Sequence, residues 1–258
     1  MKVGVPKEVR NNERRVALVP DSVSKLTAAG VEVIVQAGAG EASYFFDDAY
    51  VAAGATIAPK AQSLFESADV IVKVQRPTSD DKQAQSEIAM MPSGAVLIAL
   101  LQPLFNPDLV GELADSDITC FSMDSIPRIA RAQSMDALSS MSSIAGYKAA
   151  IIAADSLGTY FPMMVTAAGT TPPAKGLILG AGVAGLQAIA TSRRLGAVVK
   201  AFDVRPAARE QVESLGATFI EEAMHSEESE DESGYAKQLN QEAQHLEQDL
   251  IHRHAKES

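Results

Sequence analysis

The sequence predicts an α/β protein with two lobes, each built around a parallel sheet. Short runs of β-branched and aliphatic residues alternate with helical segments along most of the chain, which is the pattern of βαβ units. These runs are apolar at consecutive positions, so we expect strands that are buried on both faces. A length of 258 residues with 47% hydrophobic content is enough for one large or two modest cores.

The first lobe is expected to span residues 1–135. Helix signals separate its strands: Pro20-Asp21-Ser22 is typical of a helix start, and Gly30 is typical of a helix end. An alternation of strand and helix places successive strands in parallel. The strands are predicted at residues 3–5, 31–35, 70–74, 95–101 and 118–121.

A connecting helix and linker are expected over residues 136–172. Residues 136–157 are rich in Ala and Ser and contain few helix breakers, so they predict one long helix. Gly, Thr and Pro are concentrated at residues 167–173, which predicts a loop at the boundary between the lobes.

The second lobe, residues 173–258, contains a shorter alternation of strands and helices. Residues 221–237 are crowded with acids, Ser and Gly and cannot bury much apolar surface, so we expect a mobile acidic loop. Residues 235–258 are helical in pattern, and no strand follows. Because a doubly wound nucleotide-binding lobe has about six strands, the sequence predicts only a partial Rossmann domain. Its strands are predicted at residues 177–179, 198–202 and 217–220, and its helices at 183–195 and 206–215.

A glycine motif, Gly180-Ala-Gly182-Val-Ala-Gly185, follows one of these strands and opens a helix, the context that makes such a motif specific. Gly180 permits a tight turn, Gly182 lets a pyrophosphate approach the backbone, and Gly185 lets the helix pack closely on the strand. The helix amides and dipole would hold the phosphates without any basic residue. The cofactor contacts are expected at Gly180, Gly182, Val183, Ala184 and Gly185.

Asp203 stands at the end of the next predicted strand, where a carboxylate can accept hydrogen bonds from ribose hydroxyls and repel a 2′-phosphate. The sequence therefore predicts NAD(H) as the cofactor, with Val204 and Arg205 beside Asp203 in the site. Two alternatives stay open. Arg205 could pair with a 2′-phosphate, and the glycine motif could be a turn that binds no ligand.

Composition excludes several classes of partner. The formal charge of −11 argues against nucleic acid and against an anionic membrane surface. No apolar run reaches the ~18 residues that cross a bilayer, and the N-terminus lacks the features of a signal peptide, so no direct membrane insertion is expected. The single cysteine, Cys120, excludes an internal disulfide and fits a reducing compartment, so we expect a cytoplasmic location.

The distribution of histidine bears on the chemistry. All 4 histidines, at positions 225, 245, 252 and 254, lie towards the end of the chain. A dehydrogenase that reduces a carbonyl needs a proton donor, most often His, beside the hydride acceptor. Transfer between two nicotinamides moves a hydride alone, so the pattern favours that reaction, although Lys73 or a Tyr could serve as a donor. No metal site is expected.

Over essentially its whole length, the chain resembles the NAD(H)-binding domain of the alpha subunit of proton-translocating NAD(P) transhydrogenase. The most specific segment is Pro127-Arg-Ile-Ala-Arg-Ala-Gln-Ser-Met-Asp-Ala-Leu-Ser139, and Asp203-Val-Arg-Pro206 also matches. Gly234 and Tyr235 fall in a segment that resembles the family's mobile loop, which closes over bound nucleotide. The resemblance implies that the nicotinamide and its ribose are contacted by Arg128, Ile129, Gln133, Asp136 and Ser139, with Gln133 and Asp136 at the reacting end.

The same resemblance implies partners and a location. It implies an NADP(H)-binding domain that accepts the hydride, a membrane domain that couples the transfer to proton translocation, and a homodimer of this chain. The protein would then lie at the inner face of the cytoplasmic membrane, attached through partner subunits. Relatives continue past Ser258 into further strands, so this chain is expected to be a shortened version.

Three alternatives stay open. Alanine dehydrogenase, a sister family, shares Val3-Gly-Val-Pro-Lys-Glu8, and its positions matching Arg15 and Lys73 hold the substrate. Leu101-Gln102-Pro103 here replaces its histidine, which disfavours amino-acid oxidation, so Arg15 and Lys73 are expected instead to form charge pairs at the surface or between the lobes. An inactive truncated product is the second alternative. The third concerns the loop at 127–139, which could be an ordinary helix start capped by Ser134 or Asp136.

Overall fold

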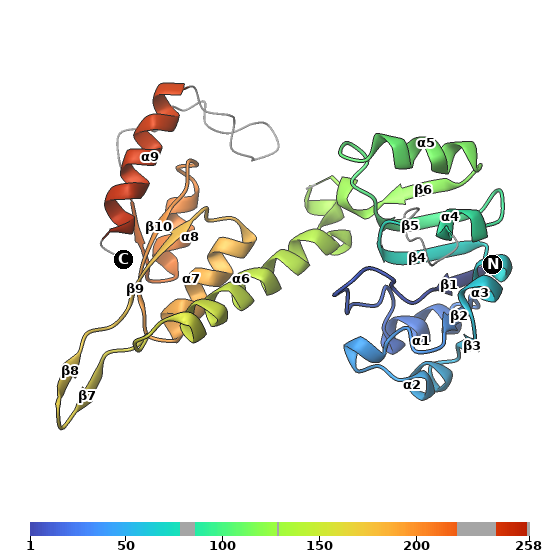
Figure 1. Ribbon diagram of the computed structural model, residues 1–258, viewed down its shortest axis with the longest axis horizontal. Coiled ribbons are helices and arrows are strands. Elements are labelled where there is room, and N and C mark those ends of the chain that lie inside the picture. The colour runs from blue at the N-terminus through green and yellow to red at the C-terminus, as the bar shows by residue number, and fades with distance from the viewer. Residues whose placement is uncertain (78–85, 128, 221–240, 257–258) are drawn as a thin grey trace. The chain divides into compact units, whose positions relative to one another are not determined.

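The computed structural model describes residues 1–77, 86–127, 129–220 and 241–256 (Figure 1). The chain divides into two compact units, Met1–Asp136 and Ala137–Ser258. Each unit is α/β and has its own parallel sheet, as the sequence predicts. The acidic segment at 221–237, together with Gly234 and Tyr235, lies outside the described residues.

Within the described residues, the first unit holds six parallel strands in the order β3-β2-β1-β4-β5-β6. Five were predicted from the sequence, and β3 was missed because its three residues are too few to show a period. The strand order reverses direction between β1 and β4, so the carboxyl ends of these strands flank a topological switch point. The strands are β1 (Lys2–Val5), β2 (Glu32–Gln36), β3 (Thr56–Ala58), β4 (Val70–Gln75), β5 (Val96–Leu100) and β6 (Thr119–Ser122).

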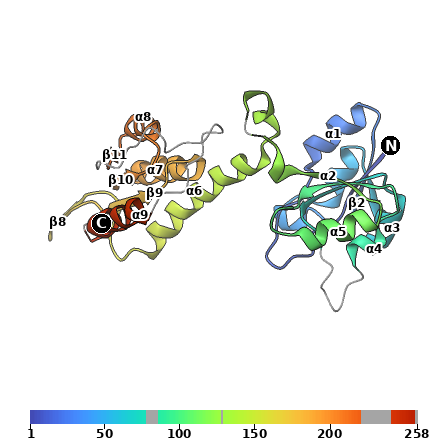
Figure 2. The same cartoon turned by 90° about the horizontal axis from the view of Figure 1, so that it is seen from above.

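Helices cover both faces of this sheet, and each face has its own core. Val5, Val33 and Val35 pack with Val23 of α1 and Tyr50 of α2. On the other face, Ile71 and Leu97 pack with side chains of α3, α4 and α5, so α1 lies on the opposite side of the sheet from α4 and α5 (Figure 2). The helices are α1 (Pro20–Ala28), α2 (Asp47–Ala52), α3 (Ala61–Ser67), α4 (Glu87–Met90) and α5 (Pro107–Asp115), with 3-10 turns at Glu41–Ser43, Met123–Ser125 and Ala130–Met135.

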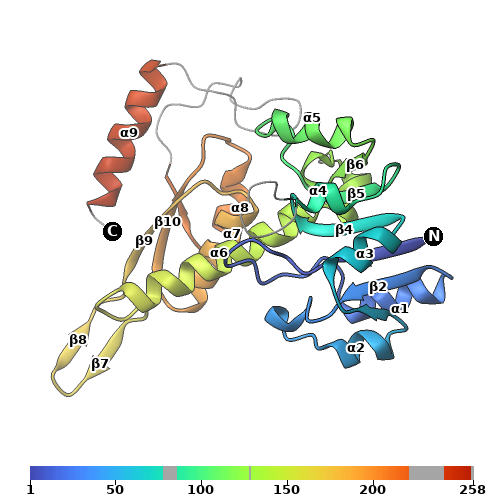
Figure 3. The same cartoon turned by 45° about the vertical axis from the view of Figure 1, so that its right-hand side comes forward.

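The second unit begins with the long helix α6 (Ala137–Ser156), which agrees with the prediction for 136–157. An antiparallel hairpin follows, β7 (Met164–Thr166) paired with β8 (Gly169–Thr171), and Figure 3 shows it between α6 and β9 (Lys175–Leu179). The loop predicted at 167–173 is therefore partly strand. The prediction treated Gly and Pro as residues that end strands. In the structure Gly169 instead has φ +132° and follows the tight turn of the hairpin.

Among the described residues, the second sheet has three parallel strands in the order β11-β10-β9. Ile178 and Ala201 on one face pack with α7 and α8, and Leu177 and Phe202 on the other pack with Leu250 of α9. From β9 to β11 these elements match the strand and helix positions predicted from the sequence to within two residues, and α9 falls inside the segment predicted to be helical, 235–258. They are α7 (Val183–Arg194), β10 (Val198–Phe202), α8 (Ala208–Ser214), β11 (Thr218–Phe219) and α9 (Gln241–Ala255).

Helices α6 and α7 lie side by side and approach very closely at one point (Figure 1). Gly146 of α6 is buried, and a Cβ atom added there would lie 1.9 Å from the carbonyl oxygen of Ala184 in α7. No real Cβ tolerates that distance, so only glycine allows this crossing. Ala184 belongs to the glycine motif, so α6 supports the first turn of α7 from behind.

Gly146→Ala should therefore push α7 away from α6 and destabilise the second unit by about 1–3 kcal/mol, the usual cost of overpacking. It should also weaken the NADH binding that the sequence predicts, because Ala184 belongs to the glycine motif. Urea unfolding and NADH titration measure the two effects.

Gly111→Ala is the matched control, since Gly111 lies inside α5 and a Cβ there meets nothing within 4 Å. It should leave stability unchanged or raise it by up to about 1 kcal/mol. A Gly146→Ala protein as stable as wild type would contradict the close approach.

Candidate functional site

The glycine motif forms the turn between β9 and α7, and each glycine meets a different constraint. Gly180 has φ +87°, and its amide donates to the carbonyl of Phe202 at 2.8 Å, which ties the turn to β10. A Cβ on Gly185 would lie 1.8 Å from the carbonyl oxygen of Gly180. Gly182 is exposed, and a Cβ there would meet nothing within 4 Å, so the space above its backbone is open. The backbone at Gly182 can thus be approached by a ligand.

The start of α7 is suited to an anion. Gly182 is the N-cap and offers no side-chain cap, and the first turn carries no acidic residue. The first amides of a helix have no partner within the helix, and the helix dipole adds a positive potential there. Val183, at the first position, is 47% exposed, so the turn is accessible to solvent. Phosphate oxygens can therefore bind here without a cationic side chain.

Asp203 follows β10 and its carboxylate is buried against the glycine motif. The residue is 5% exposed, and Oδ2 accepts a hydrogen bond from the amide of Ala181 at 2.6 Å. Oδ1 accepts from the amide of Arg205 at 2.9 Å. Burial alone would raise the pKa of this carboxyl, but the hydrogen bonds from Arg205 and Ala181 outweigh it and hold the pKa below its ordinary value. Asp203 is therefore an anion at neutral pH.

Arg205 pairs with Asp203 through its side chain. Nε donates to Oδ1 at 2.9 Å and Nη2 donates to Oδ2 at 3.0 Å, which makes the pair bidentate. The sequence places this arginine in the cofactor site and leaves open a pairing with a 2′-phosphate. Its pairing with a carboxylate two residues earlier depends on the turn after β10, which local sequence does not specify. Val204 between them is half-buried and packs against Phe202, Ile220 and Leu250.

The loop before α6 exposes several of the residues selected from the sequence. Gln133 and Ile129 are exposed, Ala132 is buried and anchors the 3-10 turn, and the amide of Asp136 donates to the carbonyl of Gln133 at 3.2 Å. This contact holds Gln133 and Asp136 in one turn. Ser139 lies in the first turn of α6. Arg128 lies outside the described residues.

A charge cluster lies at the switch point of the first unit. The sequence predicts a charge pair for Lys73 at the surface or between the lobes, whereas the cluster is buried within this unit. Lys73 is 4% exposed, and its Nζ contacts Glu87 Oε1 at 2.6 Å and Glu8 Oε2 at 3.5 Å. Burial raises the pKa of the Glu8 carboxyl, although Lys73 and the amides of Val74 and Gln75 oppose the shift. Because the three side chains come from the loop after β1, from β4 and from α4, only the folded chain brings them together.

Arg15 is also paired within the protein. Nε and Nη2 donate to the two carboxylate oxygens of Glu13 at 2.8 and 2.6 Å, and Gln75 donates to the same carboxylate at 2.7 Å. The hydrogen bond from Arg15 lowers the pKa of Glu13 to about 2. Arg15 and Lys73 are thus both paired with neighbouring glutamates.

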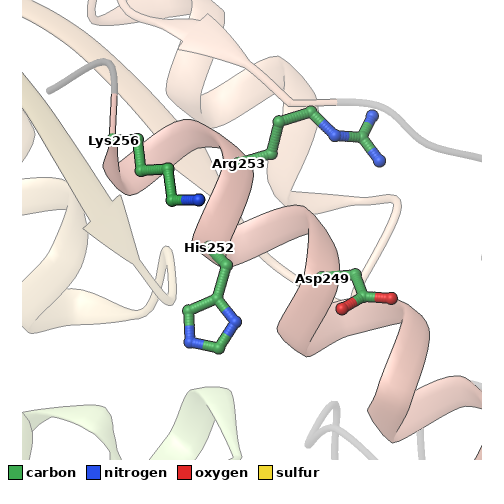
Figure 4. A pocket seen from close by; sticks show the side chains of 4 residues that line it. All are labelled: Asp249, His252, Arg253 and Lys256. Carbon is green, nitrogen blue, oxygen red and sulfur yellow. The ribbon is translucent and has the colours of Figure 1, made fainter.

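A concave surface along α9 is lined by Asp249, His252, Arg253 and Lys256. Figure 4 shows that Arg253 extends away from His252 and Lys256, so these side chains do not converge on one point. Basic residues in the last turn of a helix interact favourably with its dipole, which accounts for them without a ligand. Across the residues that the structure describes, no group of three or more His, Cys, Asp or Glu side chains could hold a metal ion.

Family models match both halves of the chain. The N-terminal domain model of alanine dehydrogenase/PNT matches residues 4–145, and the C-terminal domain model matches residues 149–256. The chain belongs to the alanine dehydrogenase/PNT family. Among the described helices of this family member, none is long and apolar enough to cross a membrane.

Relatives of both kinds are found in the family. The chain is 52% identical over 245 residues to an NAD(P) transhydrogenase alpha-subunit protein of Rhodospirillum rubrum, covering 94% of this chain and 63% of that protein. It is 34% identical over 207 residues to alanine dehydrogenase of Methanococcus maripaludis, and the match covers 79% of this chain and 53% of that protein. A crystal structure of transhydrogenase from Sinorhizobium meliloti matches with a TM-score of 0.80 and 51% identity, covering 86% of this chain and 64% of that one. The chain thus spans less than two thirds of the length of these relatives.

The Arg15–Glu13 pair gives stability a defined pH dependence. Because the pKa of Glu13 is lowered from 4.5 to about 2 on folding, its contribution is complete above pH 4.5 and is lost as the pH falls towards 2. Arg15 is 35% exposed, so we expect on the order of 1–3 kcal/mol. Arg15→Met should lower the free energy of unfolding by that amount at pH 6 and by much less at pH 3.

Urea unfolding at several pH values measures the difference between wild type and variant. Arg14→Met is the charge-matched control, because the side chain of Arg14 bonds only to Ala42 and Tyr44 among the described residues. A difference for Arg15→Met that does not change between pH 6 and pH 3 would show that Glu13 is not its partner.

Proposed function

We propose that this chain is the NAD(H)-binding portion of a proton-translocating NAD(P) transhydrogenase. In that role it presents NADH so that its hydride passes to NADP⁺ on a partner domain. The observation that carries the proposal is the glycine motif on an uncapped helix start with the ionised Asp203 beside it. The greater identity to transhydrogenase subunits than to alanine dehydrogenases supports the same choice.

The residues of the second unit fit NAD(H). Gly182 leaves its backbone open, and the first turn of α7, with Val183, Ala184 and Gly185, offers its amides to a pyrophosphate. Asp203, with Val204 and Arg205 beside it, is ionised and suited to accept from ribose hydroxyls. A negative carboxylate at this point also disfavours a 2′-phosphate, so NADH is preferred over NADPH.

Gln133 and Asp136 are proposed to orient the nicotinamide for transfer, with Arg128, Ile129 and Ser139 as further contacts. Bound NADH supplies the hydride. Gln133 is exposed in the turn before α6 and can offer a neutral amide donor and acceptor to the carboxamide of the ring. Asp136 lies in the same turn and contributes charge and hydrogen-bonding oxygens. Gly234 and Tyr235 are proposed as further contacts of the nucleotide.

Alanine-dehydrogenase activity is the second candidate function. It would require Arg15 and Lys73 to meet a small keto acid, but both are paired with glutamates, and Lys73 is buried. Glutamate partners would repel the substrate carboxylate as well as occupy the cations. NADH oxidation in the presence of pyruvate and ammonia is therefore expected to stay at background.

The partners proposed are an NADP(H)-binding domain, a membrane domain that attaches the protein to the inner face of the cytoplasmic membrane, and a second copy of this chain. Exposed apolar side chains on α6 and the hairpin support the homodimer: Ile144 is 57% exposed, Ile152 54% and Val165 70%. Sedimentation equilibrium tests it, and a monomer at micromolar concentration would contradict it.

Isothermal titration calorimetry with NADH and NADPH tests the cofactor. Wild-type protein should bind NADH more tightly than NADPH. Asp203→Ala should weaken NADH binding by about tenfold, because it removes charge-assisted hydrogen bonds to the ribose, and it should narrow the preference for NADH.

Glu210→Ala is a matched control for the loss of a carboxylate, because Glu210 is exposed in α8. A folded wild-type chain, as judged by circular dichroism, that binds neither nucleotide would refute the proposed function. An unchanged preference in Asp203→Ala would refute only the ribose role.

The loop assignment has its own test. Arg128→Ala and Asp136→Asn should each weaken NADH binding several-fold, whereas ADP-ribose, which lacks the nicotinamide, should bind with less change. Arg131→Ala, in the same exposed turn, is the charge-matched control. NADH affinity unchanged in both loop variants would assign the segment to an ordinary helix start.

A further inference from the structure

The hydrogen bonds to Asp203 leave no acceptor position for a ribose. Two come from backbone amides, those of Ala181 and Arg205, and two come from Nε and Nη2 of the Arg205 guanidinium. Each carboxylate oxygen therefore accepts two bonds, one from an amide and one from the guanidinium. Because a carboxylate offers about four lone-pair positions, this set is full.

The two kinds of donor differ in how readily they can be removed. The amides belong to the glycine motif and to the turn after β10, so they are fixed by the fold. The guanidinium is carried on a side chain that is 25% exposed, so its position is not fixed by the backbone as those of the amides are. The N–H groups on Nε and Nη2 point in parallel and donate to the two oxygens of one carboxylate. The vicinal hydroxyls of a ribose present a similar pair of neighbouring donors.

We propose that Arg205 is an internal competitor of the adenosine ribose for Asp203. The amides of Ala181 and Arg205 hold the carboxylate in position, and the guanidinium occupies the face that the ribose diol takes when NAD(H) binds. Only the fraction of molecules with Arg205 displaced accepts the ribose, so the observed affinity is lower than that of the open site. This inference rests on the proposed function and names Arg205 as a specificity-determining residue of the same site.

Removal of the competitor should strengthen binding. Arg205→Ala should lower the Kd for NADH and for ADP-ribose by the same factor, roughly two- to five-fold, the range expected for loss of a partly exposed ion pair. Arg205→Lys, which keeps the charge without the two parallel N–H groups, should lie between Arg205→Ala and wild type. NADPH should not gain affinity, because the uncovered carboxylate repels its 2′-phosphate. Arg194→Ala, an exposed arginine at the far end of α7, is the charge-matched control.

A double-mutant cycle by titration calorimetry shows whether Arg205 acts through Asp203. Asp203→Asn keeps one oxygen for the Ala181 amide but removes the charge that holds the guanidinium. In that background, Arg205→Ala should change the Kd for NADH by less than the factor seen in wild type.

Two results would overturn the inference while leaving the proposed function intact. One is weaker or unchanged NADH binding by Arg205→Ala when wild type binds, and the other is an equal gain in the wild-type and Asp203→Asn backgrounds. If neither wild type nor Arg205→Ala binds NADH or ADP-ribose, both the inference and the proposed function are wrong.

Discussion

The hydrogen bond from the Ala181 amide to the buried carboxylate of Asp203 links the two halves of the nucleotide-binding unit. It joins the turn after β9 to the end of β10, so the position of the glycine motif and that of the acid depend on each other. A buried carboxylate is unfavourable unless it is satisfied, and here both oxygens are satisfied by donors of the same unit. The glycine motif and the Asp203 carboxylate are therefore held in position by contacts within this unit.

Two close approaches of backbone fix the start of α7 against this link. Gly185 allows the helix to pack on the Gly180 carbonyl, and Gly146 allows α6 to reach the Ala184 carbonyl from the other side. Neither contact tolerates a Cβ. Gly182, in the same motif as Gly185, is under no such constraint and faces open space. The two glycines of the motif thus serve different purposes, because Gly185 permits close packing and Gly182 leaves its backbone open to approach.

The sequence predicted local features of the fold and site well. The glycine motif, Asp203 and the long helix α6 depend on spacing within a few residues, and the structure has them where the sequence predicts. Strand β3 was missed because three residues are too few to show an alternating pattern. The β7–β8 hairpin was missed because its Gly and the nearby Pro residues were interpreted as a loop. The glutamate partners of Lys73 and Arg15 were also missed, since Glu8 and Glu87 meet Lys73 only through the order of the strands.

These pairings show how an acidic protein can suit an anionic cofactor. Three cations, Lys73, Arg15 and Arg205, are each bonded to a carboxylate of the same unit. At the glycine motif, attraction for phosphate can come instead from the amides and dipole at the start of α7, which carry no formal charge and act over a short range. In the proposed role, discrimination against a 2′-phosphate comes from the ionised carboxylate of Asp203, which the ribose meets once the Arg205 guanidinium is displaced. Under that proposal, selection of the cofactor depends on the partner of Arg205 rather than on the net charge of the protein.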